Sequence, residues 1–202
     1  MFDIFFSQDT SHASIYLSYE WDKQSVVKQL RRGLMSLGYN CWMDVFALSG
    51  SEPLVEQAER ALHQADIVIS CVTTRYSHAE QCRRDVALAS TLNKPMVVLV
   101  LESTDWPPAA GPMQEALNNQ TYINCVDAGL QRKWIGVQFD ELVVRLSSMW
   151  QAIKSGKATG VAGGASRDQA EFNARQQWKK VHNIGRAAVA FNNPTSKACV
   201  IM

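Results

Sequence analysis

Short apolar runs rich in β-branched and aromatic residues alternate along the sequence with segments whose apolar residues recur at spacings of three and four. The runs, which favour strands, lie at 15–19, 39–43, 66–72, 95–101 and 121–126. The segments that favour helices lie at 24–37, 54–64, 80–92, 114–118 and 139–153. Strands that alternate with helices form a parallel sheet that is covered on both faces. The sequence therefore predicts an α/β fold, a flavodoxin-like three-layer sandwich around a five-stranded parallel sheet.

The chain of 202 residues is long enough for one domain of ordinary size and a tail, and its hydrophobic fraction of 47% suffices for a core. We expect a lead-in at 1–13, a domain at 14–153 and a basic linker and tail at 154–202. No apolar run reaches the ~18 residues of a membrane span. The apolar N-terminus lacks the basic segment of a signal peptide. The five scattered cysteines form no CxxC pair, which favours a reduced, intracellular protein.

Charge is distributed unevenly between the domain and the tail. Residues 1–150 hold 12 Lys and Arg against 17 Asp and Glu, a net charge of −5, whereas residues 151–202 hold 8 against 2, a net charge of +6. The tail is predicted to be flexible and to contain a helix at 166–190. A basic tail favours an anionic surface as its partner. Nucleic acid is not expected, because the tail has few aromatic residues and no recognition module.

Residues 39–53 combine a strand, a long loop and the start of a helix. Asp44 ends the strand, where its side chain either holds a tight turn or faces a ligand. Ser51 is the predicted N-cap of the following helix, and Pro53 lies in the first turn. In α/β sheets, ligand sites form at the carboxyl ends of the strands. We therefore expect this loop to belong to a functional site.

Several motifs, in this order and at this spacing, are similar to those of the TIR domain family. The matching segments are Ile15–Tyr19 (box 1), Tyr39–Gly50 (the second strand and the BB loop, with an aromatic-x-Asp-Val signature at Trp42–Val45) and Tyr76–Cys82 (the segment before the third helix). Phe139 lies where box 3 has Phe-Trp, but Asp140 replaces the tryptophan. The resemblance covers about residues 13–153 and implies that the domain at 14–153 is a TIR domain.

The resemblance implies a function of one of two kinds. Many members of the family are assembly modules that recruit partners through TIR–TIR contacts, and others hydrolyse NAD+ through a glutamate near the start of the third helix. Counting back from Asn93–Pro95 places Asp85 at the position of that glutamate. Aspartate is shorter by one methylene, and a misplacement of about 1 Å can cost on the order of 10²-fold in rate. NAD+ would be a substrate, and no cofactor is expected.

Asp85 also has an interpretation without a substrate. As a catalytic group, its carboxylate would stabilise positive charge on the ribose as nicotinamide leaves. As a structural group, it would be a helix N-terminal aspartate that the helix dipole favours, paired with Arg83 or Arg84. Glu80, the nearest other carboxylate, lies more than one helical turn upstream and would point elsewhere.

The resemblance also places further residues along the NAD+ cleft. They are Ser18, Tyr19, Trp42 and Asp44. Tyr19 and Trp42 would stack on a base or on the nicotinamide ring, or they would pack in the core. Asp44 would touch the ligand, or it would cap its own loop.

In the assembly interpretation, the loop after the second strand is the contact element. Its predicted contact residues are Val45, Phe46, Leu48, Ser49, Gly50, Ser51 and Pro53. The partners would be other TIR domains or a second copy of this chain.

No other group of residues predicts a catalytic or metal site. His78 lies four residues before Cys82, but no third group would orient the pair for nucleophilic catalysis. The other histidines are isolated and no metal-ligand spacing occurs, so no metal is expected. The glycines at 160–164 do not form a phosphate loop, because no Lys-Ser/Thr follows them and no strand precedes them.

The residues Cys199–Met202 fit a C-a-a-X prenylation box, with a cysteine, two aliphatic residues and a methionine that favours a farnesyl group. The alternative is a chance apolar terminus. One lipid chain binds a membrane only marginally, so a second signal is required, and the basic tail is the available one. The sequence thus predicts a cytoplasmic assembly module for signal transduction, attached by a lipid to the cytoplasmic face of a membrane. The alternative function is an NAD+ hydrolase or cyclase.

Overall fold

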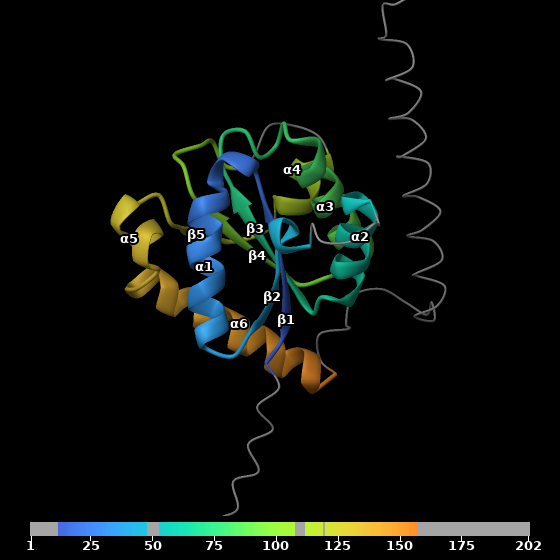
Figure 1. Ribbon diagram of the computed structural model, residues 1–202. Coiled ribbons are helices and arrows are strands. Elements are labelled where there is room, and N and C mark those ends of the chain that lie inside the picture. The colour runs from blue at the N-terminus through green and yellow to red at the C-terminus, as the bar shows by residue number, and fades with distance from the viewer. Residues whose placement is uncertain (1–11, 48–52, 108–111, 119, 157–202) are drawn as a thin grey trace, which may run out of the picture. The chain divides into compact units, whose positions relative to one another are not determined.

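Five parallel strands form the centre of the molecule in a computed structural model that describes residues 12–47, 53–107, 112–118 and 120–156. The strands are β1 (Ser14–Tyr19), β2 (Asn40–Trp42), β3 (Ile67–Val72), β4 (Met96–Val100) and β5 (Tyr122–Asn124). Their order in the sheet is β2-β1-β3-β4-β5, so β2 and β5 lie at the edges (Figure 1). The predicted α/β fold with a five-stranded parallel sheet is confirmed.

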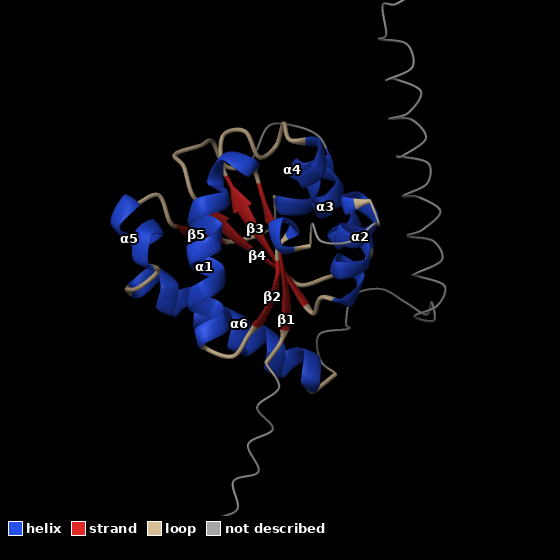
Figure 2. Ribbon diagram, in the orientation of Figure 1, coloured by secondary structure: helices blue, strands red, loops and turns tan. Residues whose placement is uncertain are grey.

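Helices cover both faces of this sheet (Figure 2). They are α1 (Gln24–Ser36), α2 (Leu54–Gln64), α3 (Glu80–Thr91), α4 (Pro112–Leu117), α5 (Ala128–Lys133) and α6 (Val137–Lys154), with 3-10 turns η1 (Trp21–Lys23) and η2 (Asp44–Phe46). The apolar sides of α1, α5 and α6 pack in one core cluster with alternate residues of the strands. Helices α2 and α3 contact β1 and each other on the opposite face. These are the three layers of the expected sandwich.

The first strand shows why two different environments arise on the two sides of the sheet. All of its residues after Ser14 are buried, and successive side chains point to opposite faces. Ile15, Leu17 and Tyr19 belong to the core cluster with α1. Tyr16 and Ser18 face the other way, toward α3, where both bind its Asp85. The α3 side of β1 therefore carries polar groups, whereas its α1 side is almost wholly apolar.

The helix after β1 ends where the sequence indicates. Val27, Leu30 and Leu34 form the buried side of α1, and the helix stops at Ser36. Gly38 follows with a φ of 93°, a conformation that favours glycine. The backbone N–H of Tyr39 then donates to the carbonyl of Leu34 at 3.2 Å, which closes the turn into β2.

The start of α2 differs from the prediction. Pro53, rather than Ser51, occupies the N-cap position, because the helix begins at Leu54. The extended backbone of Pro53 presents its carbonyl to the amides of Glu56 and Gln57, at 3.0 and 3.2 Å. A proline is tolerated here because its missing N–H has no partner at a helix start.

Helix α5 and its connection to α6 were not expected from the sequence. Asp127 caps α5, accepting a hydrogen bond from the amide of Leu130 at 2.7 Å. Trp134 ends the helix in a left-handed conformation, and its indole N–H donates to the carbonyl of Val26 in α1 at 3.1 Å. The buried Trp134 thus fixes the α5–α6 connection against α1.

The tail helix expected at 166–190, Cys199 and Leu48 to Glu52 of the contact loop lie outside the described residues. Within the described part of the chain, no helix combines the length and hydrophobicity that a membrane span requires. The four cysteines of that part, Cys41, Cys71, Cys82 and Cys125, are free thiols buried in the domain.

Candidate functional site

Asp85 lies in the second turn of α3, on the side of the helix that faces the sheet. Cys82, Val86 and Ala89, the buried neighbours at helical spacing, lie on the same side. The residue is only 6% exposed. A charged residue at such a position must be paired or hydrogen-bonded, because burial of an isolated carboxylate is very unfavourable.

Hydrogen bonds from the strand below satisfy both carboxylate oxygens of Asp85. The Tyr16 hydroxyl donates to Oδ1 at 3.0 Å, and the Ser18 hydroxyl donates to Oδ2 at 2.7 Å. Ser18 in turn accepts a hydrogen bond from the hydroxyl of Tyr76 at 2.8 Å. The four residues Tyr16, Ser18, Tyr76 and Asp85 form a buried network, called the Asp85 network below.

Burial dominates the electrostatics of this network. It raises the pKa of Asp85 to about 7, against an opposing effect of the hydrogen bonds from Ser18 and Tyr16, and the charge of Asp44 raises it further. The pKa values of Tyr16 and Tyr76 are raised well above their ordinary values, chiefly by burial. Asp85 is therefore a carboxyl group that changes protonation near neutral pH, whereas the hydroxyls of Tyr16 and Tyr76 stay protonated.

The structural alternative considered for Asp85 was wrong in its details. Asp85 is not in the first turn of α3, so the dipole argument does not apply to it. Arg84 pairs instead with Glu80, one turn upstream on the exposed side of the helix. The partners of Asp85 are hydroxyl groups from β1, which its position on the buried side of α3 makes accessible.

The structure divides the predicted cleft residues between two environments. Ser18 belongs to the Asp85 network, and Trp42 stacks on Tyr16 with ring centroids 4.7 Å apart and an interplanar angle of 13°. Tyr19, by contrast, packs in the core cluster on the opposite face of β1. Its hydroxyl donates to Oδ1 of Asp44. The four predicted cleft residues thus do not line one common cavity wall in this structure.

Asp44 holds the turn that follows β2. Its Oδ1 accepts a hydrogen bond from the amide of Val45 at 2.7 Å as well as the one from Tyr19. The other oxygen, Oδ2, is buried and has no hydrogen-bond partner in the described structure. Asp44 therefore caps its own loop, which is one of the two roles that the sequence suggested for it. One of its oxygens, Oδ2, is not used by the turn.

The described part of the contact loop exposes an aromatic side chain at its start. Phe46 is 54% exposed, whereas Val45 is half-buried and Pro53 is exposed at the far end. The Phe46 ring lies against two cations of α1, with Arg31 Cζ at 4.3 Å and Lys28 Nζ at 5.8 Å from its centroid. This is a polar-rimmed aromatic surface next to the edge strand β2.

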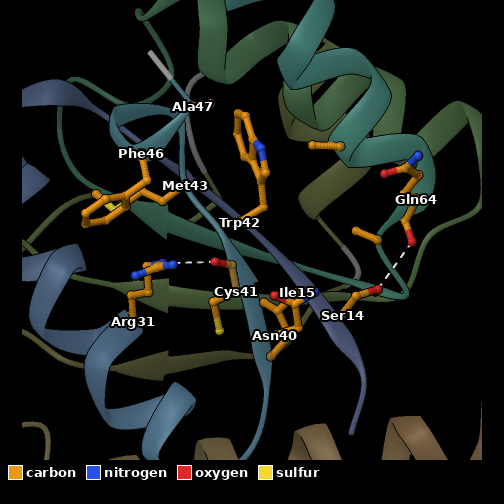
Figure 3. A pocket seen from close by; sticks show the side chains of 12 residues that line it. Ser14, Ile15, Arg31, Asn40, Cys41, Trp42, Met43, Phe46, Ala47 and Gln64 are labelled. Atoms are coloured by element: carbon orange, nitrogen blue, oxygen red, sulfur yellow. Dashed lines mark hydrogen bonds between the residues drawn. The ribbon is translucent and has the colours of Figure 1, made fainter. Parts of the chain in front are cut away.

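A pocket of about 310 Å³ runs along this edge (Figure 3). Its lining comes from both sides of β2 and includes Arg31, Trp42, Phe46 and Gln64. Arg31 Nε donates to the carbonyl of Cys41 at 2.9 Å and so occupies a backbone acceptor of β2. Asp85 is not among the residues that line this pocket, so the pocket and the Asp85 network are separate features.

Comparison with known proteins assigns this fold to a family. A family model described as TIR domain matches residues 15–143, more than half of the chain. This chain belongs to the TIR domain family. The TIR domain is also similar to a solved structure, the TIR domain of the Toll-related receptor TRR-2 from the lower metazoan Hydra magnipapillata. That similarity has 13% sequence identity and a TM-score of 0.49, and covers 66% of this chain and 97% of the other. No curated protein matches the sequence.

Two residues of this TIR domain's candidate site were missed in the sequence, Tyr16 and Tyr76. Tyr16 lies two residues before Ser18 in a strand, so its side chain had to face the same side of the sheet. Tyr76 lies in the irregular segment between β3 and α3, where no periodicity indicates a direction. Its amide is held by Thr73, with bonds of 3.2 Å to the carbonyl and to the hydroxyl.

The polar groups of the described TIR domain do not form a metal centre. No group of three or more His, Cys, Asp or Glu side chains is placed to hold a metal ion in the ranges that the structure describes. The thiols are poor nucleophiles as placed: burial raises the pKa of both Cys41 and Cys125 to about 12.

Proposed function

We propose that this TIR domain is a signalling and assembly module that acts through TIR–TIR contacts and is tethered to a membrane by its tail. The observation that carries the proposal is the closed Asp85 network. Both oxygens of the carboxylate are bound by hydroxyls of the same domain, and the side chain is buried. A catalytic carboxylate has to reach its substrate, and here both of its oxygens already accept hydrogen bonds from Tyr16 and Ser18, while Trp42 stacks on Tyr16.

The contact loop supports the assembly function. Phe46 presents a large apolar surface with two cations beside it. Aromatic and arginine side chains supply most of the binding free energy in protein interfaces. The turn that presents Phe46 is held by hydrogen bonds, because Asp44 accepts from the amide of Val45 and from the hydroxyl of Tyr19. A preorganised contact residue loses little conformational entropy on binding.

The tether would raise the local concentration of this module. Confinement to a surface makes weak self-association productive, because a second binding event becomes effectively intramolecular. The proposal rests on the sequence Cys199–Met202 and on the net charge of +6 in residues 151–202. A prenyl chain and a basic segment are two weak signals that together give stable but reversible membrane binding.

The first prediction concerns this tether. Cys199→Ser removes the only sulfur to which a prenyl group can be attached in the box, so the full chain expressed in a eukaryotic cell should move from the membrane fraction to the soluble fraction. Met202→Leu is the matched control, because leucine at the last position still directs prenylation and membrane binding should persist. Undiminished membrane binding of Cys199→Ser would disprove the lipid tether.

A second candidate function, NAD+ hydrolysis, is favoured by one observation. The pKa of Asp85 is raised to about 7, which suits an acid or base that works near neutral pH, and Ser18 lies within hydrogen-bond distance of it. An opening of the Tyr16–Trp42 stack would be needed to admit the substrate. In that case Asp85 would take the place of the family's glutamate.

The second prediction separates these functions. We expect the concentrated full chain, incubated with NAD+ on anionic vesicles, to release no more nicotinamide than a protein-free control. Asp85→Asn serves as the comparison, since the amide is nearly isosteric and can occupy the same network. Nicotinamide release by the wild-type chain that Asp85→Asn abolishes would establish the hydrolase and contradict this expectation.

A further inference from the structure

Two of the most exposed large apolar side chains in the described residues lie at one corner of the domain, between α5 and α6. Ile135 is 65% exposed and Val137 is 77% exposed. Arg132 and Lys133, in the last turn of α5, are exposed immediately before them. These four residues are called the α5–α6 corner below. Exposed apolar residues next to cations occur on surfaces that meet a membrane interface or a protein partner.

The corner is held by residues on either side of the exposed pair. Trp134, between Lys133 and Ile135, is buried and donates its indole N–H to the carbonyl of Val26. Its left-handed conformation, with a φ of 48°, and the φ of 110° at Gly136 turn the chain sharply at this point. The buried indole therefore fixes a turn from which the side chains of Ile135 and Val137 project into solvent. Nothing in the Asp85 network or the contact loop uses these residues.

We propose that the α5–α6 corner docks on an anionic membrane surface, with Ile135 and Val137 inserted at the headgroup level and Arg132 and Lys133 paired with lipid phosphates. The charge of the corner itself is complementary to such a surface, since it contains two cations and no acidic residue. Basic side chains near an anionic leaflet strengthen binding that apolar side chains alone leave marginal. The cellular setting of this inference rests on the proposed tether, which would bring the domain to the membrane.

The neighbouring surface of α6 determines which orientation is possible. Asp140 and Glu141 are exposed on the helix directly after Val137, and Glu141 pairs with Arg145 at 2.6 Å. Val144, 63% exposed, lies two turns from Val137, beyond these carboxylates. An anionic membrane would repel Asp140, so α6 would not lie flat on it. The corner would insert by its tip, and Val144 would remain in water.

The experiment uses the full chain produced without prenylation, so that its outcome does not depend on Cys199. Co-sedimentation is measured with vesicles of phosphatidylcholine, with and without about one-third phosphatidylserine. We expect the wild-type chain to bind the anionic vesicles. The double variant Ile135→Ser/Val137→Ser should bind at least fivefold more weakly. The double variant Arg132→Gln/Lys133→Gln should also bind more weakly, and its difference from the wild type should shrink as the salt concentration rises. The matched control Val144→Ser should bind within twofold of the wild-type chain. Circular dichroism confirms that each variant is folded.

Three results would overturn the inference. The first is a wild-type chain that is found only in the supernatant. The second is an Ile135→Ser/Val137→Ser variant that binds as the wild type does, as it would if the basic tail alone bound the vesicles. An equal loss in Val144→Ser would show that the whole exposed face of α6 is the contact, as a protein partner would use it. None of these results would bear on the proposed tether, which the fractionation of Cys199→Ser tests separately.

Discussion

Asp85→Asn is expected to change the pH dependence of stability more than any other substitution of an aspartate in the domain. Burial raises the pKa of Asp85 from 3.8 to about 7 in the folded protein. The folded state therefore binds a proton that the unfolded state has lost, and stability falls as the pH rises from about 4 to about 7. The free energy of unfolding of Asp85→Asn, relative to wild type, should increase by about 3 kcal/mol between pH 4.5 and pH 8.

The difference in the free energy of unfolding between Asp85→Asn and wild type isolates the effect of Asp85 from that of the other titrating groups. Chemical denaturation of both proteins is measured across the pH range, and the difference between them is plotted. Asp105→Asn, an exposed aspartate in an irregular segment, is the control and should show no comparable trend. A constant difference between Asp85→Asn and wild type from pH 4.5 to pH 8 would show that Asp85 is not held as the structure describes.

The Asp85 network gives Asp85 a structural role. A buried carboxylate that ionises near pH 7 lowers stability at and above that pH, and the hydroxyls of Tyr16 and Ser18 offset part of this cost. Asp85→Ala would leave the Tyr16 hydroxyl without its partner in the core. Asparagine rather than alanine is therefore the informative substitution at Asp85, because loss of activity in an unfolded variant would carry no information.

Most of the sheet was predictable because its three central strands, β1, β3 and β4, are buried on both faces. The apolar runs at 66–72 and 95–101 match β3 and β4 to within one residue at each end, and the helix at 54–64 matches α2. Helix α5 was not predictable in the same way. Its six residues, Ala128–Lys133, contain too little apolar periodicity to distinguish a short helix from a loop. It is defined by the Asp127 cap and by the packing of Trp134, which depends on α1.

The candidate site was predictable only in part. The TIR resemblance selected Asp85 and Ser18, which the structure brings within 2.7 Å of each other. It grouped Tyr19 and Asp44 with them, although Tyr19 lies on the other face of β1. The alternation of side chains along a strand would have separated Ser18 from Tyr19 and joined Tyr16 to Ser18. The position of Tyr76 depends on the course of the loop after β3, which no local pattern in the sequence specifies.

The second large effect is expected at Phe46, on the contact loop. An aromatic side chain that forms the buried centre of an interface costs about 2 kcal/mol or more when it is truncated, which is well over tenfold in affinity. The ring is 54% exposed and lies beside Arg31 and Lys28, so a partner surface would bury an apolar ring and meet two cations at once. Phe46→Ala should therefore weaken self-association at least tenfold while the fold is retained.

Sedimentation velocity of the full chain over a wide range of protein concentration tests whether this TIR domain assembles through the loop after β2. We predict that the wild-type chain self-associates and that Phe46→Ala shifts the association to at least tenfold higher concentration. Val144→Ala, which truncates an even more exposed side chain on α6, should leave the association unchanged. Assembly through the loop after β2 would be contradicted by a wild-type chain that stays monomeric at every concentration, or by a Phe46→Ala variant that associates as the wild type does.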